Sequence, residues 1–133
     1  EKFSGYHTGV DFEIINGEEN SVVEVTAACT GAVRVKQFVN GYGGVVVQDC
    51  ILASEKVTVL YGHLNLDSIT VSVGNTLNQG DDVGNLGDGY SAQTDGERKH
   101  LHLSIHQGTD INYKGYVSTE AALGDWLDPE AYW

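Results

Sequence analysis

Three of the five histidines of this chain lie close together in "HLHLSIH", residues 100–106. Alternate side chains of a strand point to one face, so His100, His102 and His106 are expected to line the same side of a sheet. The first two would be about 6–7 Å apart along the strand. Both could reach one metal ion, or one could bind the metal while the other faces a substrate. The spacing predicts one site for His100 and His102 and leaves both arrangements open.

The other histidines are His7, in "HTGVD", and His63, in "LYGHLNL". In a fully extended strand His7 and Asp11 would be about 13 Å apart. That is too far for two ligands of one zinc ion, because each ligand lies only about 2 Å from the metal. We therefore expect the chain between them to curl, and Gly9 is the residue that could allow it. A lone histidine such as His63 is more often a hydrogen-bonded structural residue than a catalyst.

Short runs rich in β-branched residues are separated by turn sequences such as "NGYGG". The strands predicted from these runs are 21–29, 31–39, 44–52, 56–64, 68–73 and 99–106. They predict an all-β fold, an antiparallel β sandwich or partly open barrel, with at most one short helix near the C-terminus, within 118–127. The glycine-rich stretch 80–96 is predicted to be a loop that runs into His100 and could form a wall of its site.

Composition limits the class of protein. The 133 residues fit one domain, 1–133, and the formal net charge of −12 argues against binding to nucleic acid or to anionic membranes. No apolar run approaches the roughly 20 residues that span a bilayer. The chain has no methionine, so we expect a mature or excised piece of a longer protein. Cys29 and Cys50 flank a predicted hairpin and could form a disulfide, typical of exported proteins, or remain two buried thiols.

The motifs "HTGVD", "YGHL", a glycine-rich loop and "HLH" follow one another along the chain. "VTAACTGAVRV" lies between the first two of them, and "DPEAYW" lies after "HLH". In this order they resemble the LytM/lysostaphin-type zinc metallopeptidases, which are peptidoglycan endopeptidases. The resemblance covers nearly the whole chain. Leu103 and Ser104 replace the family's usual Phe-Glu, and Arg98 and Lys99 replace its usual Gly-Pro. These departures bear on substrate preference rather than on the chemistry.

The resemblance implies that one zinc ion is bound per chain by His7, Asp11 and His102. It implies that His63 and His100 are the catalytic pair beside the metal. Three protein ligands leave the fourth zinc position open, as catalytic sites do. His106 has no counterpart in the family, and we interpret it as a structural or rim residue.

The implied function is zinc-dependent hydrolysis of peptide bonds in peptidoglycan stem peptides or cross-bridges, outside the cytoplasm (secreted, periplasmic or cell-wall associated). A targeting domain could have been lost from this piece of the chain. One alternative is a non-catalytic LytM-like domain that binds the cell wall or activates another wall hydrolase. Another is a structural β domain with incidental histidines, which a metal analysis would identify by the absence of zinc. The full set of ligand and catalytic residues favours the zinc metalloendopeptidase.

Overall fold

The structure is a computed structural model that describes residues 6–7, 9–14, 17–18, 21–108, 116–117 and 126–127, with the backbone alone at 6–7, 9–10, 116–117 and 127. The strands are β1 Tyr6–His7, β2 Gly9–Glu13, β3 Glu24–Thr26, β4 Gly31–Val39, β5 Gly43–Leu52, β6 Glu55–Leu64, β7 Thr76–Leu77, β8 Asp82–Asn85, β9 His100–Gln107, β10 Tyr116–Val117 and β11 Trp126–Leu127. Two single turns of 3-10 helix, η2 Leu66–Ser68 and η3 Ala92–Thr94, also lie among these residues.

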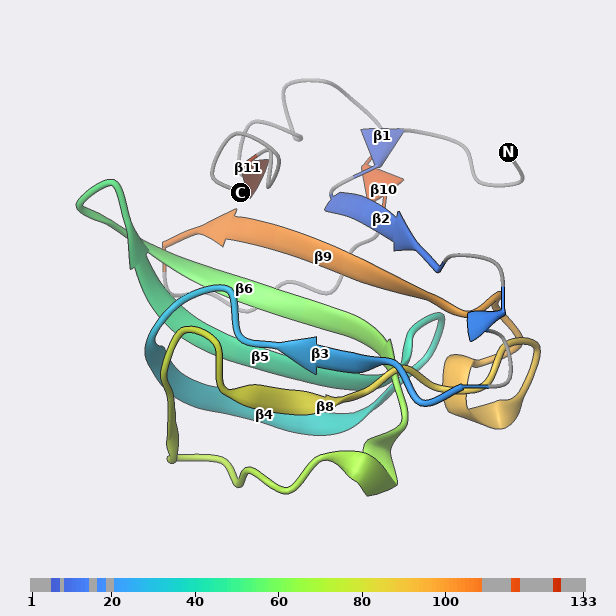
Figure 1. Ribbon diagram of the computed structural model, residues 1–133. Coiled ribbons are helices and arrows are strands. Elements are labelled where there is room, and N and C mark those ends of the chain that lie inside the picture. The colour runs from blue at the N-terminus through green and yellow to red at the C-terminus, as the bar shows by residue number, and fades with distance from the viewer. Residues whose placement is uncertain are drawn as a thin grey trace.

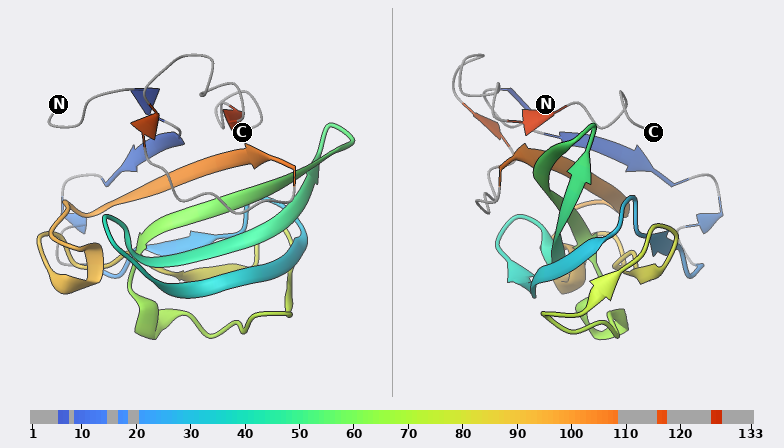
Figure 2. Two further views of the ribbon diagram at one scale, coloured as in Figure 1. Left: turned by 180° about the vertical axis from the view of Figure 1, so that it is seen from behind. Right: turned by 90° about the vertical axis from the view of Figure 1, so that its left-hand side faces the viewer.

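Seven strands form one antiparallel sheet in the order β11-β9-β6-β5-β4-β7, with β2 paired to β9 beside β11. β3 pairs with β8 and β1 pairs with β10, each antiparallel. The large sheet curls so that the β3–β8 pair lies against one of its faces (Figures 1 and 2). This confirms the predicted all-β, partly open antiparallel architecture.

The main core lies between the β3–β8 pair and the large sheet. Val25 of β3 and Val83 of β8 join the same buried cluster as Val46, Val59 and Ile105 of the sheet. Because alternate residues of a strand point to opposite faces, β5 also places side chains on the face of the sheet that is turned away from the main core. The residues buried on that face form a second, smaller cluster: Val45 and Val47 of β5, Leu60 of β6, and Tyr42 just before β5. The large sheet therefore buries side chains on both faces, and the histidines of β9 lie on the face of the second cluster.

Several predicted elements differ from the structure, and the strand expected at 21–29 is limited to β3, Glu24–Thr26. Residues 68–73 were expected to form a strand, but Ser68 ends η2 and the residues after it are in no strand. β7 pairs with the edge of β4 instead, so the β-branched residues of this segment have no partner strand. Of the predicted strand, only Ile69 is buried.

The stretch 80–96 was expected to be a loop, but it contains β8 and η3. β8 forms because Val83 completes the core against β3. Of the predicted helix within 118–127, the last two residues form β11 and the rest lies outside the described residues.

Cys29 and Cys50 form a disulfide that closes a loop with a sequence separation of 21. Beside it the fully buried Gln48 side chain donates hydrogen bonds to the carbonyls of Cys29 and Gly31 and accepts one from the Tyr61 hydroxyl. The disulfide therefore ties the chain just before β4 to β5, next to a buried polar network. The alternative of two free thiols is excluded.

Replacing both cysteines by alanine is expected to lower the free energy of unfolding by about 3 kcal/mol, because a cross-link closing a loop of this size restricts the unfolded chain by roughly that amount. Urea unfolding of the oxidised wild type and the double variant measures the difference. The zinc content under native conditions should not change, because the disulfide is not part of the histidine site. An unchanged urea midpoint would mean that the cross-link contributes nothing to stability.

Candidate active site

The pairing register of β9 assembles the site. His102 lies opposite Asp11 of β2 on one side and opposite Gly62 of β6 on the other. Residues directly opposite one another in an antiparallel pair project from the same face. His100 and His102 are both 2 % exposed, whereas Leu103 points into the main core. The prediction that the two histidines of H-x-H share one face is thus confirmed.

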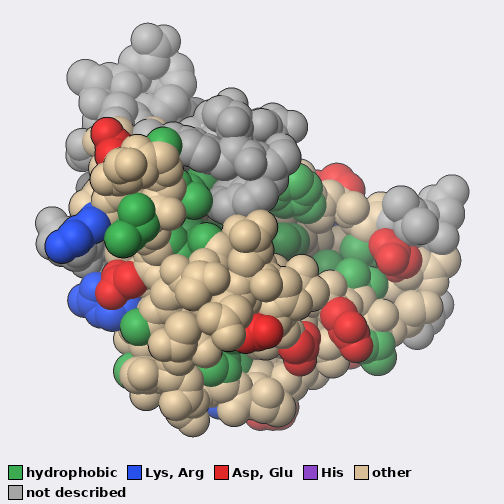
Figure 3. Space-filling view, turned by 60° about the vertical axis from the view of Figure 1, so that its left-hand side comes forward, with side chains coloured by type: hydrophobic (Ala, Val, Ile, Leu, Met, Phe, Trp, Pro, Cys, Tyr) green, Lys and Arg blue, Asp and Glu red, His purple; other side chains and the backbone are tan. Residues whose placement is uncertain are grey.

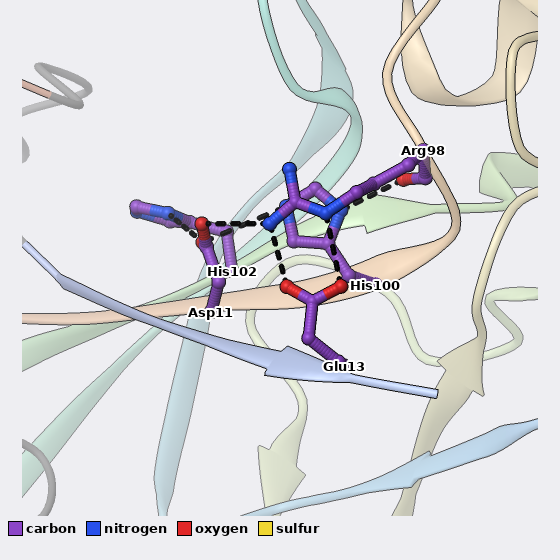
Figure 4. A network of polar contacts seen from close by, with 5 residues as sticks. All are labelled: Asp11, Glu13, Arg98, His100 and His102. Carbon is purple, nitrogen blue, oxygen red and sulfur yellow. Dashed lines mark hydrogen bonds and ion pairs between the residues drawn. The ribbon is translucent and has the colours of Figure 1, made fainter. Parts of the chain in front are cut away.

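The Asp11 carboxylate lies between these two histidines and Arg98 (Figure 4). Its Oδ1 atom is 3.2 Å from Nδ1 of His102 and 3.5 Å from Nε2 of His100. The other ring nitrogen of His100, Nδ1, is 2.7 Å from the carbonyl of Arg98. A carbonyl only accepts, so Nδ1 of His100 carries a proton and donates it there. Nε2 of His100 is the atom left facing the carboxylate.

A β-bulge directs His63 toward the same site. Gly44 pairs with Leu64 and Val46 pairs with Tyr61, so two residues of β6, Gly62 and His63, oppose one residue of β5. Tyr61 and Leu64 both point into the main core, which a regular strand does not allow for residues three apart. The extra residue, His63, has a positive φ of 66° and turns its side chain to the other face. Its ring centroid lies 4.3 Å from that of His100 and 6.3 Å from that of His102.

Tyr42 packs under the histidines and was not found by sequence reasoning. Its ring centroid is 4.9 Å from that of His102 and 5.7 Å from that of His63. A Cβ atom on Gly62 would lie 2.9 Å from the Tyr42 ring, so the glycine leaves the space that the ring fills. The available signal was this glycine inside a strand, next to His63, because such a glycine marks the close approach of another group.

Burial and neighbouring charges set different proton affinities for two of the histidines. Burial, and then the positive charges that His100 and His102 can carry, lower the pKa of His63 to about 3. Burial also acts to lower the pKa of His100, but the hydrogen bonds to Asp11 and to the Arg98 carbonyl outweigh it and raise that pKa above its ordinary value. In the metal-free protein at neutral pH, His63 is therefore a neutral imidazole, and of the two His100 binds a proton more readily. All three histidines are buried, and none is visible on the face drawn in Figure 3, where acidic side chains are scattered.

His7 is described by its backbone alone. β1, which contains it, pairs with β10, whereas β2, which contains Asp11, pairs with β9. The chain therefore changes partner strands between the two residues, in keeping with the expected departure from one extended strand. Among the described side chains, which do not include that of His7, no group of three His, Cys, Asp or Glu residues could hold a metal ion.

The two expected zinc ligands that the structure does describe fit such an ion. Donor atoms about 2.0–2.1 Å from a tetrahedral zinc ion are about 3.3 Å from each other. The separation of 3.2 Å between Asp11 Oδ1 and His102 Nδ1 agrees with that value. A carboxylate oxygen and an imidazole nitrogen are also ordinary zinc ligands. The structure thus brings Asp11, His63, His100 and His102 together.

His106 lies away from this group. It pairs with Trp126 in the neighbouring strand β11, and the two rings meet edge to face with centroids 4.7 Å apart. This contact agrees with the structural role predicted for it. The prediction that it takes no part in catalysis stays a prediction.

The curled antiparallel sheet thus gathers an aspartate and three histidines on one face. The sequence matches peptidase family M23 over residues 5–114, and the chain belongs to this family. A search of the curated proteins found no match.

Solved structures show the same fold. CbpA from L. salivarius REN is 26% identical, with a TM-score of 0.61 over 97% of this chain and 75% of that one. LytU is 22% identical, with a TM-score of 0.66 over 99% of this chain and 75% of that one. Lysostaphin from Staphylococcus simulans, an antimicrobial peptidase, is 21% identical, with a TM-score of 0.64 over 98% of this chain and 47% of that one. The predicted LytM-type fold is confirmed.

Proposed function

We propose that this protein is a zinc-dependent endopeptidase that hydrolyses peptide bonds in the stem peptides or cross-bridges of peptidoglycan. The observation that supports the proposal most is the convergence of Asp11, His100 and His102, joined by His63 through a bulge, in a chain of family M23. The bulge and the left-handed backbone of His63 turn its side chain toward the other three residues. Such features cluster at functional sites, where they aim a side chain.

In this proposal His7, Asp11 and His102 hold one zinc ion. When bound, zinc would act as a Lewis acid that polarises the scissile carbonyl and lowers the pKa of water. His63 and His100 then move the protons. The His63 ring lies beside that of His100, and the fixed Nδ1–H of His100 leaves its Nε2 to exchange a proton with the reacting groups.

The protein would act outside the cytoplasm, where peptidoglycan lies. The Cys29–Cys50 disulfide supports this location, since disulfides form and persist in oxidising compartments. The described residues contain no helix with the length and hydropathy to cross a membrane.

Digestion of purified peptidoglycan tests the proposal. We expect the zinc-loaded protein to release peptides with new amino termini from sacculi of one cross-link type, either glycine bridges or direct links from D-alanine to a diamino acid, as identified by mass spectrometry. Removal of zinc with a chelator should stop the release, and added zinc should restore it. Binding to sacculi without cleavage, in a protein that carries zinc, would support the alternative of a non-catalytic wall-binding domain.

A further inference from the structure

Arg98 joins two carboxylates of β2 just before β9 begins. Its Nε atom donates to Oε1 of Glu13 at 2.9 Å, and its Nη2 atom donates to Oε2 of the same side chain. Nη2 also lies 3.4 Å from Oδ2 of Asp11. The guanidinium is thus held in a two-pronged pair by Glu13 and turned toward Asp11 (Figure 4).

The two oxygens of Asp11 consequently face different partners. Oδ1 faces the imidazoles of His102 and His100, and Oδ2 faces Arg98. A carboxylate that is free to rotate can offer a metal either one oxygen or both. Here the guanidinium occupies the side of Oδ2, so one oxygen remains directed at the histidine ligand.

We propose that Arg98, held by Glu13, is a positioning residue that orients Asp11 so that Oδ1 alone is presented to the metal. This inference rests on the proposed function, because it concerns the zinc ligand assigned there. The planar fork of arginine matches two carboxylate oxygens at once, which the single ammonium of lysine cannot do. Partners of this kind that orient a metal ligand typically change metal affinity or activity by about 10–100-fold when they are replaced.

A surface ion pair with no such role would behave differently, and the chain contains one for comparison. Arg34 pairs with Asp49 at 3.0 Å, with side chains 39% and 37% exposed. The Arg98 and Glu13 side chains are similarly exposed, at 45% and 52%. Arg34 lies on β4, which is separated from β9 by β5 and β6. Arg34→Gln is therefore a matched control that removes an exposed arginine–carboxylate pair far from the ligands.

The test measures zinc affinity by competition with a chromophoric chelator, in the wild type, Arg98→Gln, Arg98→Lys and Arg34→Gln. We expect about 10-fold weaker binding in both Arg98 variants, because lysine keeps the charge but loses the fork, and unchanged binding in Arg34→Gln. The visible spectrum of the cobalt-substituted protein gives a second measurement. In Arg98→Gln the absorption should weaken and shift, as the released carboxylate binds through both oxygens and raises the coordination number.

The zinc affinities and cobalt spectra distinguish a positioning role of Arg98 from an effect of its charge alone. Tighter zinc binding in Arg98→Gln, or full retention of affinity in Arg98→Lys, would show that Arg98 acts by its charge alone and would overturn the inference. So would affinities and cobalt spectra equal to those of the wild type. Failure of the wild type to bind zinc would overturn the proposed function and, with it, this inference.

Discussion

Replacing His102 with alanine is expected to remove the metal from the protein. His102 is the proposed ligand with the most complete structural support, since it lies opposite Asp11 in the β2–β9 register with donor atoms 3.2 Å apart. Without it, two ligands remain, and zinc affinity should fall by more than about 100-fold, beyond the range seen for residues that only orient a ligand. The measurement is the zinc content per chain after gel filtration at micromolar protein concentration.

His106→Ala is the matched control for this variant. It removes the same side chain from the same strand, but His106 packs on Trp126 rather than on Asp11. We expect it to keep one zinc ion per chain. If the His102→Ala protein is folded and still carries one zinc ion per chain, then His102 is not a ligand and the assignment of the site is wrong.

The parts of this site that local periodicity governs could be predicted from the sequence. Alternation along a strand predicted that His100 and His102 share a face, and the strand that carries them is β9. The hairpin strands 31–39 and 44–52 were predicted nearly to the residue, because a run of β-branched residues bounded by a glycine-rich turn has few other ways to fold.

What the sequence did not provide was the pairing between distant strands. Nothing local indicates that Asp11 lies opposite His102 or that Arg98 reaches Glu13, since these contacts depend on β2 joining β9 across the sheet. Alternation alone would have turned His63 into the main core with Tyr61. Only the bulge, which arises from the pairing of β6 with β5, directs it to the site.

The failed prediction of a strand at 68–73 has the same origin. Its β-branched residues favour extended backbone, but a strand is stable only beside a partner, and the edge of β4 pairs with β7. Conversely, β8 is only four residues long and begins and ends with polar residues. It forms because Val83 fills the core opposite β3.

Replacing His63 or His100 is expected to leave zinc bound while hydrolysis falls by about 10²–10⁴-fold, the scale of a lost acid–base group. His100 can be replaced by alanine. For His63, asparagine is the better choice, because the backbone there has a positive φ of 66°, which asparagine adopts more readily than alanine. The imidazole is removed in both variants, while the bulge and the neighbouring strand pairing should persist.

Zinc content and cleavage rate must be measured on the same samples, because the two together separate a proton-transfer group from a ligand. Loss of zinc in His100→Ala would mean that both histidines of H-x-H bind the metal, the arrangement that their spacing alone left open. A rate close to that of the wild type in either variant would remove that histidine from the mechanism. If only His63→Asn were inactive, His63 alone would transfer the proton, and the contact of His100 with Asp11 would serve to orient the carboxylate.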